Sequence, residues 1–242
     1  MRHFEALDRH DKIALQFSGG KDSLACLYLL RPHWDRLTVY WLDSGDTFPE
    51  TRSLIKKIRE MVPNFEAIKS DVRQVHDLYG IPADIVPESG TPFGRMVGHD
   101  APLIQGRYSC CFATIMKPMH ERMMADGVTL VIRGQRADDK LRGQLKSGDV
   151  IDGIEFMFPI EDWTQRQVMD FLKAEGAPIP RFYQMMNTSP DCMSCSAWWE
   201  DGRAAYLKRY HHETYLEYQR RLDAINQAVS QHIAHFNTEV TP

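Results

Sequence analysis

Five cysteines are the residues of this chain whose spacing first suggests chemistry. Cys110 and Cys111 are adjacent, and Cys192 and Cys195 form a C-x-x-C pair later in the chain. Two tight pairs of reduced thiols are typical of a metal site. Adjacent cysteines direct their side chains apart, which suits an iron–sulfur cube better than one tetrahedral zinc ion, because the two thiolates can bind different iron atoms. Zinc, buried thiols without metal and a redox C-x-x-C are the alternatives.

A glycine-rich stretch, SGGKDS, lies between an expected strand at 12–17 and an expected helix at 22–31. Its glycines allow a sharp turn and the close approach of a phosphate, and the N–H groups at the helix N-terminus point at such an anion. The spacing differs from the Walker loop and from GxGxxG. An ordinary turn is the alternative, but the loop follows a strand at the sheet edge where open α/β sheets bind ligands. The phosphate-binding residues that we expect are Ser18, Gly19, Gly20, Lys21, Asp22 and Ser23.

The elements that must position these residues alternate between strands and helices. This order predicts an α/β fold: a Rossmann-like parallel sheet with helices on both faces, followed by a C-terminal helical segment. Residues 80–106, rich in Gly and Pro, predict a long surface loop, and apolar residues three or four apart predict a long helical region over 203–236. The other predicted strands are 37–42, 65–70, 128–134 and 154–160, and the other predicted helices are 50–61, 112–126 and 162–176.

Composition bounds the class of protein. The chain has 242 residues, 43% of them apolar and 26% charged, with a net charge of −4. At ~150 residues per domain, we expect one nucleotide-binding domain over 1–200 and a helical extension over 201–242. The weakly acidic charge gives no global case for nucleic-acid binding. No run approaches the ~18 apolar residues of a membrane span, and no secretory signal is visible, so we expect a cytoplasmic protein.

SGGKDS resembles the pyrophosphate loop of the adenine nucleotide alpha-hydrolase superfamily. Four further segments are similar, in order, to motifs of its phosphoadenosine phosphosulfate (PAPS) reductase family: LDSGDTFPET at 42–51, RGQRADD at 133–139, PIEDWTQRQV at 159–168 and PDCMSC at 190–195. The resemblance implies a Rossmann-like sheet that binds ATP, with Mg²⁺, or an adenylyl sulfate. The paired cysteines resemble those of adenylyl-sulfate (APS) reductases, which implies a 4Fe-4S cluster. Its implied ligands are Cys110, Cys111, Cys192 and Cys195.

The sequence departs from the reductase pattern in three places. Residues 196–242 contain no cysteine, whereas the reductases carry a nucleophilic one in a C-terminal segment. The loop keeps Lys21 and Asp22, which the members that cleave ATP retain and which suit a triphosphate with Mg²⁺. After the adjacent cysteines, Thr114 and Ile115 replace an Arg-Lys pair.

The first two departures favour an ATP pyrophosphatase that forms AMP and adenylates an acceptor for sulfur transfer, as in nucleic-acid thiolation or DNA phosphorothioation. The third tempers this interpretation, because it changes the electrostatic surroundings of the cluster. The expected partners are the nucleotide, a sulfur donor such as a cysteine desulfurase or a thioredoxin-like protein, and a nucleic-acid acceptor. The alternatives are an APS or PAPS reductase that uses an external thiol, and a non-catalytic nucleotide-binding subunit. We expect the catalytic residues to be Lys21, Asp22 and Arg136.

Several other residues have two readings. Asp43 ends a strand and is expected at the ribose or Mg²⁺, whereas Gly134 and Arg136 follow a strand and are expected at the ribose or a phosphate. Asp43 is equally well read as a turn aspartate. The motif also makes Asp138 and Asp139 candidate bases or Mg²⁺ ligands, while Cys26 falls on an apolar helix face and is expected in the core. Arg107 and Lys117 are anion-binding candidates or surface residues, His211 and His212 are expected on a solvated helix face, and Lys140, Arg142 and Lys146 are candidates for a local basic surface.

Overall fold

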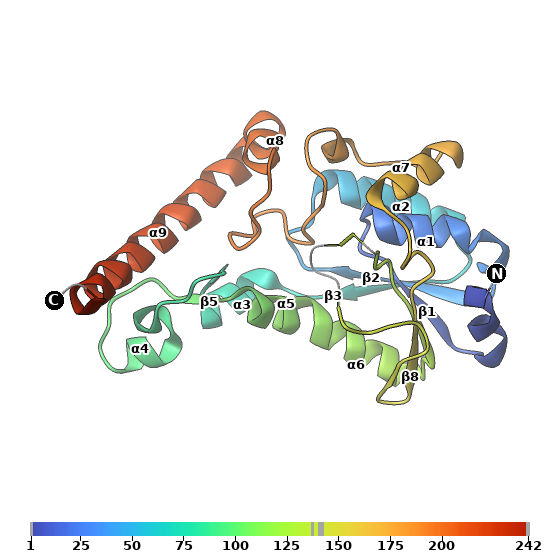
Figure 1. Ribbon diagram of the computed structural model, residues 1–242, viewed down its shortest axis with the longest axis horizontal. Coiled ribbons are helices and arrows are strands. Elements are labelled where there is room, and N and C mark those ends of the chain that lie inside the picture. Colours follow the sequence, from blue (N-terminus) through green and yellow to red (C-terminus); the bar gives the residue numbers. More distant parts are fainter. Residues whose placement is uncertain (1, 137, 140–142, 241–242) are drawn as a thin grey trace. The chain divides into compact units, whose positions relative to one another are not determined.

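The computed structural model describes residues 2–136, 138–139 and 143–240 (Figure 1). The chain forms two compact units. The first contains residues 1–43, 49–69 and 118–181, and the second contains residues 44–48, 70–117 and 182–242. The predicted domain division at residue 200 stays a prediction, because compact packing does not test independent folding.

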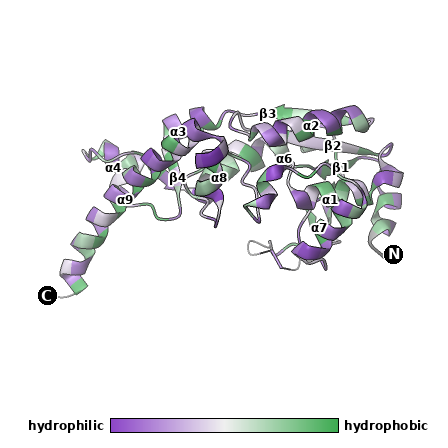
Figure 2. Ribbon diagram, turned by 90° about the horizontal axis from the view of Figure 1, so that it is seen from above, coloured by the Kyte–Doolittle hydropathy of each residue, from purple (hydrophilic) through white to green (hydrophobic). Residues whose placement is uncertain are grey.

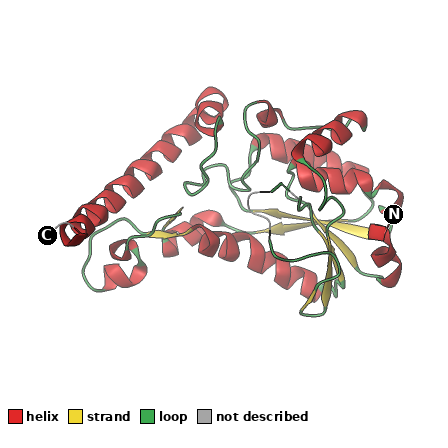
Figure 3. Ribbon diagram, in the orientation of Figure 1, coloured by secondary structure: helices red, strands yellow, loops and turns green. Residues whose placement is uncertain are grey.

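A six-stranded sheet forms the centre of the first unit, with the strand order β3-β2-β1-β6-β8-β7. Every pairing is parallel except that of β7 with β8 at the edge. The predicted α/β class with a mainly parallel sheet is therefore confirmed, as the strands in yellow show (Figure 3). The strands are β1 (Ile13–Gln16), β2 (Leu37–Asp43), β3 (Phe65–Lys69), β6 (Leu130–Ile132), β7 (Val150–Ile151) and β8 (Ile154–Met157).

Alternating side chains divide the first unit's core between the two faces of its sheet. Leu15, Val39 and Ile132 pack in the larger cluster with α1 (Lys21–Leu29), α2 (Pro49–Met61) and α7 (Gln165–Ala174). Ala14 and Val131 point the other way, toward Met119 and Met123 of α6 (Lys117–Ala125). Helices thus cover both faces, as predicted. Most of α1 is buried, including Cys26 as expected, and Figure 2 colours much of this helix as hydrophobic.

The second unit is built mainly from helices and a two-stranded parallel sheet, β4-β5. Aromatic side chains from Phe48, Phe182, Tyr206 and Tyr218 form one of its clusters, and Ile104 and Ile225 contribute to another. The elements of this unit are α3 (Val72–Tyr79), β4 (Ile81–Ala83), a 3-10 helix (Glu88–Gly90), α4 (Pro92–Met96), β5 (Ile104–Gly106), α5 (Arg107–Cys111), a π-helical turn (Phe112–Met116), α8 (Arg203–Tyr210) and α9 (His212–Val240). Further 3-10 helices lie at Arg2–Arg9 and Arg31–His33 in the first unit and at Arg181–Gln184.

Two sequence expectations are corrected in the second unit. The surface loop expected over 80–106 contains β4, α4 and β5, because three-residue strands are too short to show a period. The helix expected to begin at 112 begins at Arg107 and passes through the π-helical turn. The long helical region expected over 203–236 is confirmed, and it consists of two helices, because the backbone of His211 leaves helical geometry with φ −142° and ψ 60°.

Candidate functional site

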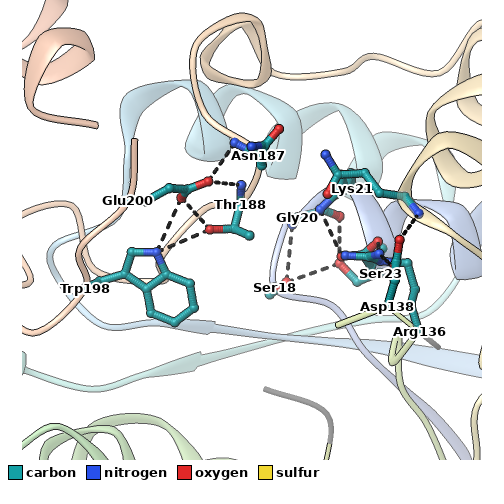
Figure 4. Close-up of polar contacts among 12 residues, drawn as sticks. Ser18, Gly20, Lys21, Ser23, Arg136, Asp138, Asn187, Thr188, Trp198 and Glu200 are labelled. Carbon is teal, nitrogen blue, oxygen red and sulfur yellow. Dashed lines mark hydrogen bonds and ion pairs between the residues drawn. The ribbon is translucent and has the colours of Figure 1, made fainter. Parts of the chain in front are cut away.

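The glycine loop connects β1 to α1 in the first unit. Gly19 has a φ of +79°, the left-handed region that favours glycine, and a Cβ there would lie 2.5 Å from Cγ2 of Thr51. Ser18 Oγ accepts a hydrogen bond from the N–H of Gly20 at 3.2 Å and lies 3.3 Å from Oγ of Ser23 (Figure 4). The first-turn N–H groups of α1 have no partner within the helix. The tight turn therefore presents a helix N-terminus of the kind that binds anions.

Charged side chains meet beside this loop. Lys21 is 1% exposed, and its Nζ lies 3.2 Å from Oδ2 of Asp22. Oδ1 of Asp22 lies 2.6 Å from Nε of the buried Arg136, which also pairs with Asp138. Burial lowers the pKa of Lys21, and Asp22 opposes that shift. A phosphate or Mg²⁺ arriving here must replace part of these ion pairs, with the phosphate joining the cations or the Mg²⁺ joining the carboxylates.

Gly134 and Asp43 lie where the strands of the first unit end. A Cβ on Gly134 would lie 2.6 Å from the carbonyl carbon of Asp22, so glycine allows the chain after β6 to touch the start of α1. Asp43 ends β2, and its two carboxylate oxygens accept hydrogen bonds from Arg52 at 2.6 and 2.8 Å. The structure thus brings Gly134 to the loop and engages Asp43 in an ion pair. The nucleotide-binding roles of both residues stay predictions.

The adjacent cysteines lie at the end of α5 in the second unit. Cys110 is buried, and its sulfur lies 3.6 Å from Nε2 of His76 and 4.0 Å from Oγ1 of Thr114. The π-helical turn begins directly after Cys111. A π-helical turn changes the direction of side chains relative to an α-helix, and such turns are frequent at functional sites.

The C-x-x-C pair forms a turn in the same unit. The N–H of Cys195 donates to the carbonyl of Cys192 at 3.4 Å, and the thiol of Cys192 donates to Oγ of Ser44 at 3.3 Å. Asp46 secures this turn, because its Oδ2 accepts from both the N–H and the hydroxyl of Ser194, at 2.8 and 2.5 Å. Charge-assisted hydrogen bonds of this kind are strong.

Burial and neighbouring charges shift the pKa of all four paired cysteines. Burial raises the pKa of Cys110 to about 11 and that of Cys111 to about 12, and the charge of Cys195 raises both further. Burial also raises the pKa of Cys192 and Cys195, and Arg203 opposes the shift at Cys195. Without a metal, all four groups are therefore favoured as protonated thiols at neutral pH.

Four thiols in one unit fit an iron–sulfur cluster in the chemistry of their donor atoms. All four are free. Within the described ranges, however, no group of three or more Cys, His, Asp or Glu side chains is arranged to hold a metal ion. Four cysteines are thus the right type of ligand for an iron–sulfur cluster. Their coordination of a metal and the 4Fe-4S assignment stay predictions.

The remaining candidates lie in varied surroundings. Arg107 pairs with Asp84, with Nε 3.2 Å from Oδ1. His212 is exposed on α9, as expected, whereas His211 is half-buried and packs against the rings of Phe48 and Tyr206. Lys117 is the first residue of α6, Lys146 is exposed, and Asp139 contributes to the electrostatic field at Lys21. Lys140 and Arg142 lie outside the described residues.

A family model decides what this set of motifs represents. The model of the phosphoadenosine phosphosulfate reductase domain matches residues 12–198. The chain belongs to this family. The match runs from β1 through the C-x-x-C turn, so both the loop and the four cysteines of this PAPS reductase-family protein lie within it.

Curated relatives of this PAPS reductase-family protein are similar over most of its length. It is 24% identical over 192 residues to an adenosine 5'-phosphosulfate reductase of Burkholderia cepacia, covering 78% of this chain and 71% of the relative. It is 21% identical over 207 residues to the enzyme of that name from Allochromatium vinosum, covering 79% and 75%. A phosphoadenosine 5'-phosphosulfate reductase of Gloeobacter violaceus is 24% identical over 196 residues, covering 79% and 75%.

A solved structure supports the fold. The crystal structure of phosphoadenylyl-sulfate (PAPS) reductase from Candida auris, in a phosphate complex, matches with a TM-score of 0.51 at 16% identity. The match covers 74% of this chain and 83% of that one. At this identity the likeness concerns the fold. In addition, no helix among the described residues of this family member is long and apolar enough to cross a membrane.

Sequence reasoning missed three residues that shape the cysteine region. Asp46 lies inside the quoted motif at 42–51, so its position was visible and its partner was not. His76 and Arg203 carried no signal, because a histidine or an arginine on a helix usually lies at the surface. The structure places His76 against Cys110 and buries Arg203 completely.

Proposed function

We propose that this chain is an enzyme that binds an adenine nucleotide at the glycine loop and reduces a sulfonucleotide with a thiol supplied by another protein. The observation that carries this proposal is the family match over residues 12–198, together with curated relatives that are named as APS or PAPS reductases. The reductase was the second reading of the sequence, and the comparisons favour it over the first.

The proposed reaction has two steps that balance. A thiolate attacks the sulfur of the sulfonucleotide, the S–O bond to the phosphate breaks, and the nucleotide leaves with the electron pair, which gives a thiosulfonate. The leaving nucleotide is AMP from APS and adenosine 3',5'-bisphosphate from PAPS. A second thiolate attacks the first sulfur and releases sulfite with formation of a disulfide, so two thiols are oxidised and the sulfur is reduced by two electrons. Residues 196–242 contain no cysteine, so we assign both thiols to a thioredoxin-like partner.

The loop residues have defined tasks in this proposal. Phosphate oxygens accept from the N–H groups at the start of α1, while Arg136 and Lys21 balance their charge. Because both cations already pair with Asp22, binding of the anion redistributes existing contacts. The proposed phosphate-binding set is Ser18, Gly19, Gly20, Lys21, Asp22, Ser23 and Arg136, with Asp43 and Gly134 at its edge.

We assign a 4Fe-4S cluster to Cys110, Cys111, Cys192 and Cys195. When bound, it would supply a redox-active group with a net negative charge beside these residues. The protein's own contribution is to exclude water by burial and to hold the C-x-x-C turn through Asp46.

The ATP pyrophosphatase reading remains a second candidate, supported by the charged loop itself. Asp22 is partly exposed, with 21% of its side chain accessible, while the neighbouring Lys21 is buried. A carboxylate at this position suits Mg²⁺ on a triphosphate. The reaction would be ATP plus an acceptor oxygen giving an adenylated acceptor and pyrophosphate, with a nucleic acid as acceptor and a cysteine desulfurase as the source of sulfur.

One anaerobic assay separates these functions. The protein is incubated with APS or PAPS plus reduced thioredoxin, and separately with ATP, Mg²⁺ and DNA or tRNA. Sulfite release supports the reductase, whereas pyrophosphate release supports the second candidate. Asp22→Asn should abolish turnover in either case, and Asp8→Asn is the matched control, because Asp8 pairs with Arg36 at 3.1 Å and is 80% exposed. Tight nucleotide binding without either product would overturn both and leave a non-catalytic subunit.

A further inference from the structure

The last turns of α9 are exposed on all sides in the second unit. The helix is 29 residues long, and every residue from 231 to 240 is exposed. Isolated helical segments shorter than ~12–15 residues are marginal in water, because helices in proteins gain most of their stability by packing one face. A final segment of this length therefore requires a partner to stabilise it.

An apolar stripe runs along α9 into this segment. Ile225 is buried in a core cluster of the second unit, and Val229 packs against the same cluster. Ile233, Phe236 and Val240 continue the stripe, because residues three or four apart lie on one face of a helix. These three residues are 50%, 60% and 60% exposed. The first half of the stripe is thus covered by the chain's own core, and the second half faces solvent.

A second exposed apolar patch adjoins the stripe. It consists of Phe93, Met96 and Val97, in α4 and directly after it, and all three residues are more than half exposed. Phe93 and Val97 line a cavity of about 250 Å³ together with His232, and Figures 1 and 2 show α4 beside the C-terminal half of α9. A stable interface buries about 800 Å² on each partner, whereas one aromatic side chain supplies only ~150–250 Å². The patch on α4 adds area that the stripe alone lacks.

The charge pattern of this part of α9 favours a second copy of the chain as the partner. Between Asp223 and Val240, the sequence has one formally charged residue, Glu239. A face that selects a different protein commonly does so with complementary charges, whereas two copies of an uncharged face meet without repulsion. Parallel pairing would place Glu239 against the same residue of the other copy. Antiparallel pairing avoids this contact and also opposes the two helix dipoles.

We propose that this chain forms a two-fold symmetric dimer in which the C-terminal segments of two α9 helices pack antiparallel through Ile233, Phe236 and Val240. A two-fold axis near Phe236 brings the two Phe236 side chains together. It also places Ile233 of each copy opposite Val240 of the other, because these residues lie three positions before and four positions after Phe236. A two-fold interface uses the same patch on both copies, and the stripe is self-complementary in this sense. The proposal does not depend on the proposed reaction.

Sedimentation equilibrium of the full chain tests this proposal by measuring the dimer dissociation constant. Phe236→Glu places two negative charges at the axis and should raise the constant at least a hundredfold, while Phe236→Leu should keep it within tenfold of wild type. Leu216→Glu is the matched control. Leu216 is 42% exposed on the same helix and lies on the side opposite the stripe, so this variant should stay within threefold of wild type.

A mixing experiment tests the antiparallel orientation. Ile233→Glu and Val240→Lys should each weaken the dimer at least tenfold, and an equal mixture of the two variants should restore it. The reason is that antiparallel pairing sets the new carboxylate of one variant against the new amine of the other. Circular dichroism checks that each variant is folded, which we expect because all three substituted positions of the stripe are exposed.

Two outcomes would overturn the dimer. One is wild-type protein that stays monomeric at its highest soluble concentration, and the other is F236E protein that dimerises as tightly as wild type. If F236E does not fold, I233E decides the same question. A mixture of folded I233E and V240K proteins that binds no more tightly than either variant alone would overturn the antiparallel arrangement.

Discussion

Gly134 lies against the backbone of Asp22 so closely that a Cβ would come within 2.6 Å of the Asp22 carbonyl carbon. The contact joins the segment after β6 to the first turn of α1, on which the expected phosphate site depends. Both partners in this contact are backbone, so neither side can rotate away as a flexible side chain would. The glycine of the RGQRADD motif thus has a packing role that is independent of any ligand.

Replacing Gly134 with alanine should lower the free energy of unfolding by about 1–3 kcal/mol, the usual cost of overpacking. Urea denaturation measures this change. Gly106→Ala is the control, because a Cβ there meets its nearest atom, Oγ of Ser109, at an ordinary 3.7 Å. Equal stability of the two variants would show that the chain after β6 adapts without strain.

Asp46→Ala should destabilise the C-x-x-C turn, because the substitution leaves the N–H and hydroxyl of Ser194 without their acceptor. We expect a loss of about 1.5–3 kcal/mol, the range for hydrogen bonds to a charged group. Thermal unfolding of the metal-free protein reports the loss. Asp71→Ala, which removes a carboxylate that caps α3 in the same unit, should cost about 1 kcal/mol. A smaller effect at Asp46 than at Asp71 would contradict the proposed role.

Lys21 predicts a pH dependence of stability with a definite sign. Burial lowers its folded-state pKa below 10.5, so the unfolded chain binds more protons in this range, and the contribution of Lys21 to stability rises with pH toward 10.5. Buried Cys26 and Tyr40 have raised pKa values and act in the opposite direction. The measurement is therefore the difference in unfolding free energy between wild type and Lys21→Met from pH 7 to 10. The unfolding free energy of wild type should increase relative to that of Lys21→Met as pH rises. A difference that does not change with pH would argue against a lowered pKa of Lys21.

The cysteines should divide into four that retain iron and one that does not. Serine at Cys110, Cys111, Cys192 or Cys195 should remove most of the cluster's broad absorbance near ~400 nm after anaerobic reconstitution. Cys26→Ala should keep the full iron content, because Cys26 is completely buried in the core of the first unit. A colourless wild-type protein that contains zinc would refute the cluster, and loss of iron in Cys26→Ala would refute the division.

The sequence predicted the sheet well because its strands carry strong local signals. Buried β-branched and aromatic residues at 37–42 mark β2, and the glycine loop marks the carboxyl end of β1. The prediction of a loop over 80–106 was wrong for the opposite reason. The strands β4 and β5 are stabilised by pairing with each other, and three residues are too few to show a local pattern. The helical region over 203–236 was predicted, but the break at His211 was not visible, because the apolar residues that mark the region begin only at Leu222.

The amino-acid sequence by itself determined the family, the α/β class, the position of the glycine loop and the two cysteine pairs, because motifs and periodicity are local properties of the chain. The tertiary structure alone decided which distant groups meet. It paired Lys21 and Arg136 with Asp22, bound Asp46 to Ser194 of the C-x-x-C turn, and buried Arg203 against the carbonyls of Met193 and Trp198. Burial and charge pairing depend on residues far apart in the chain, so no local pattern encodes them.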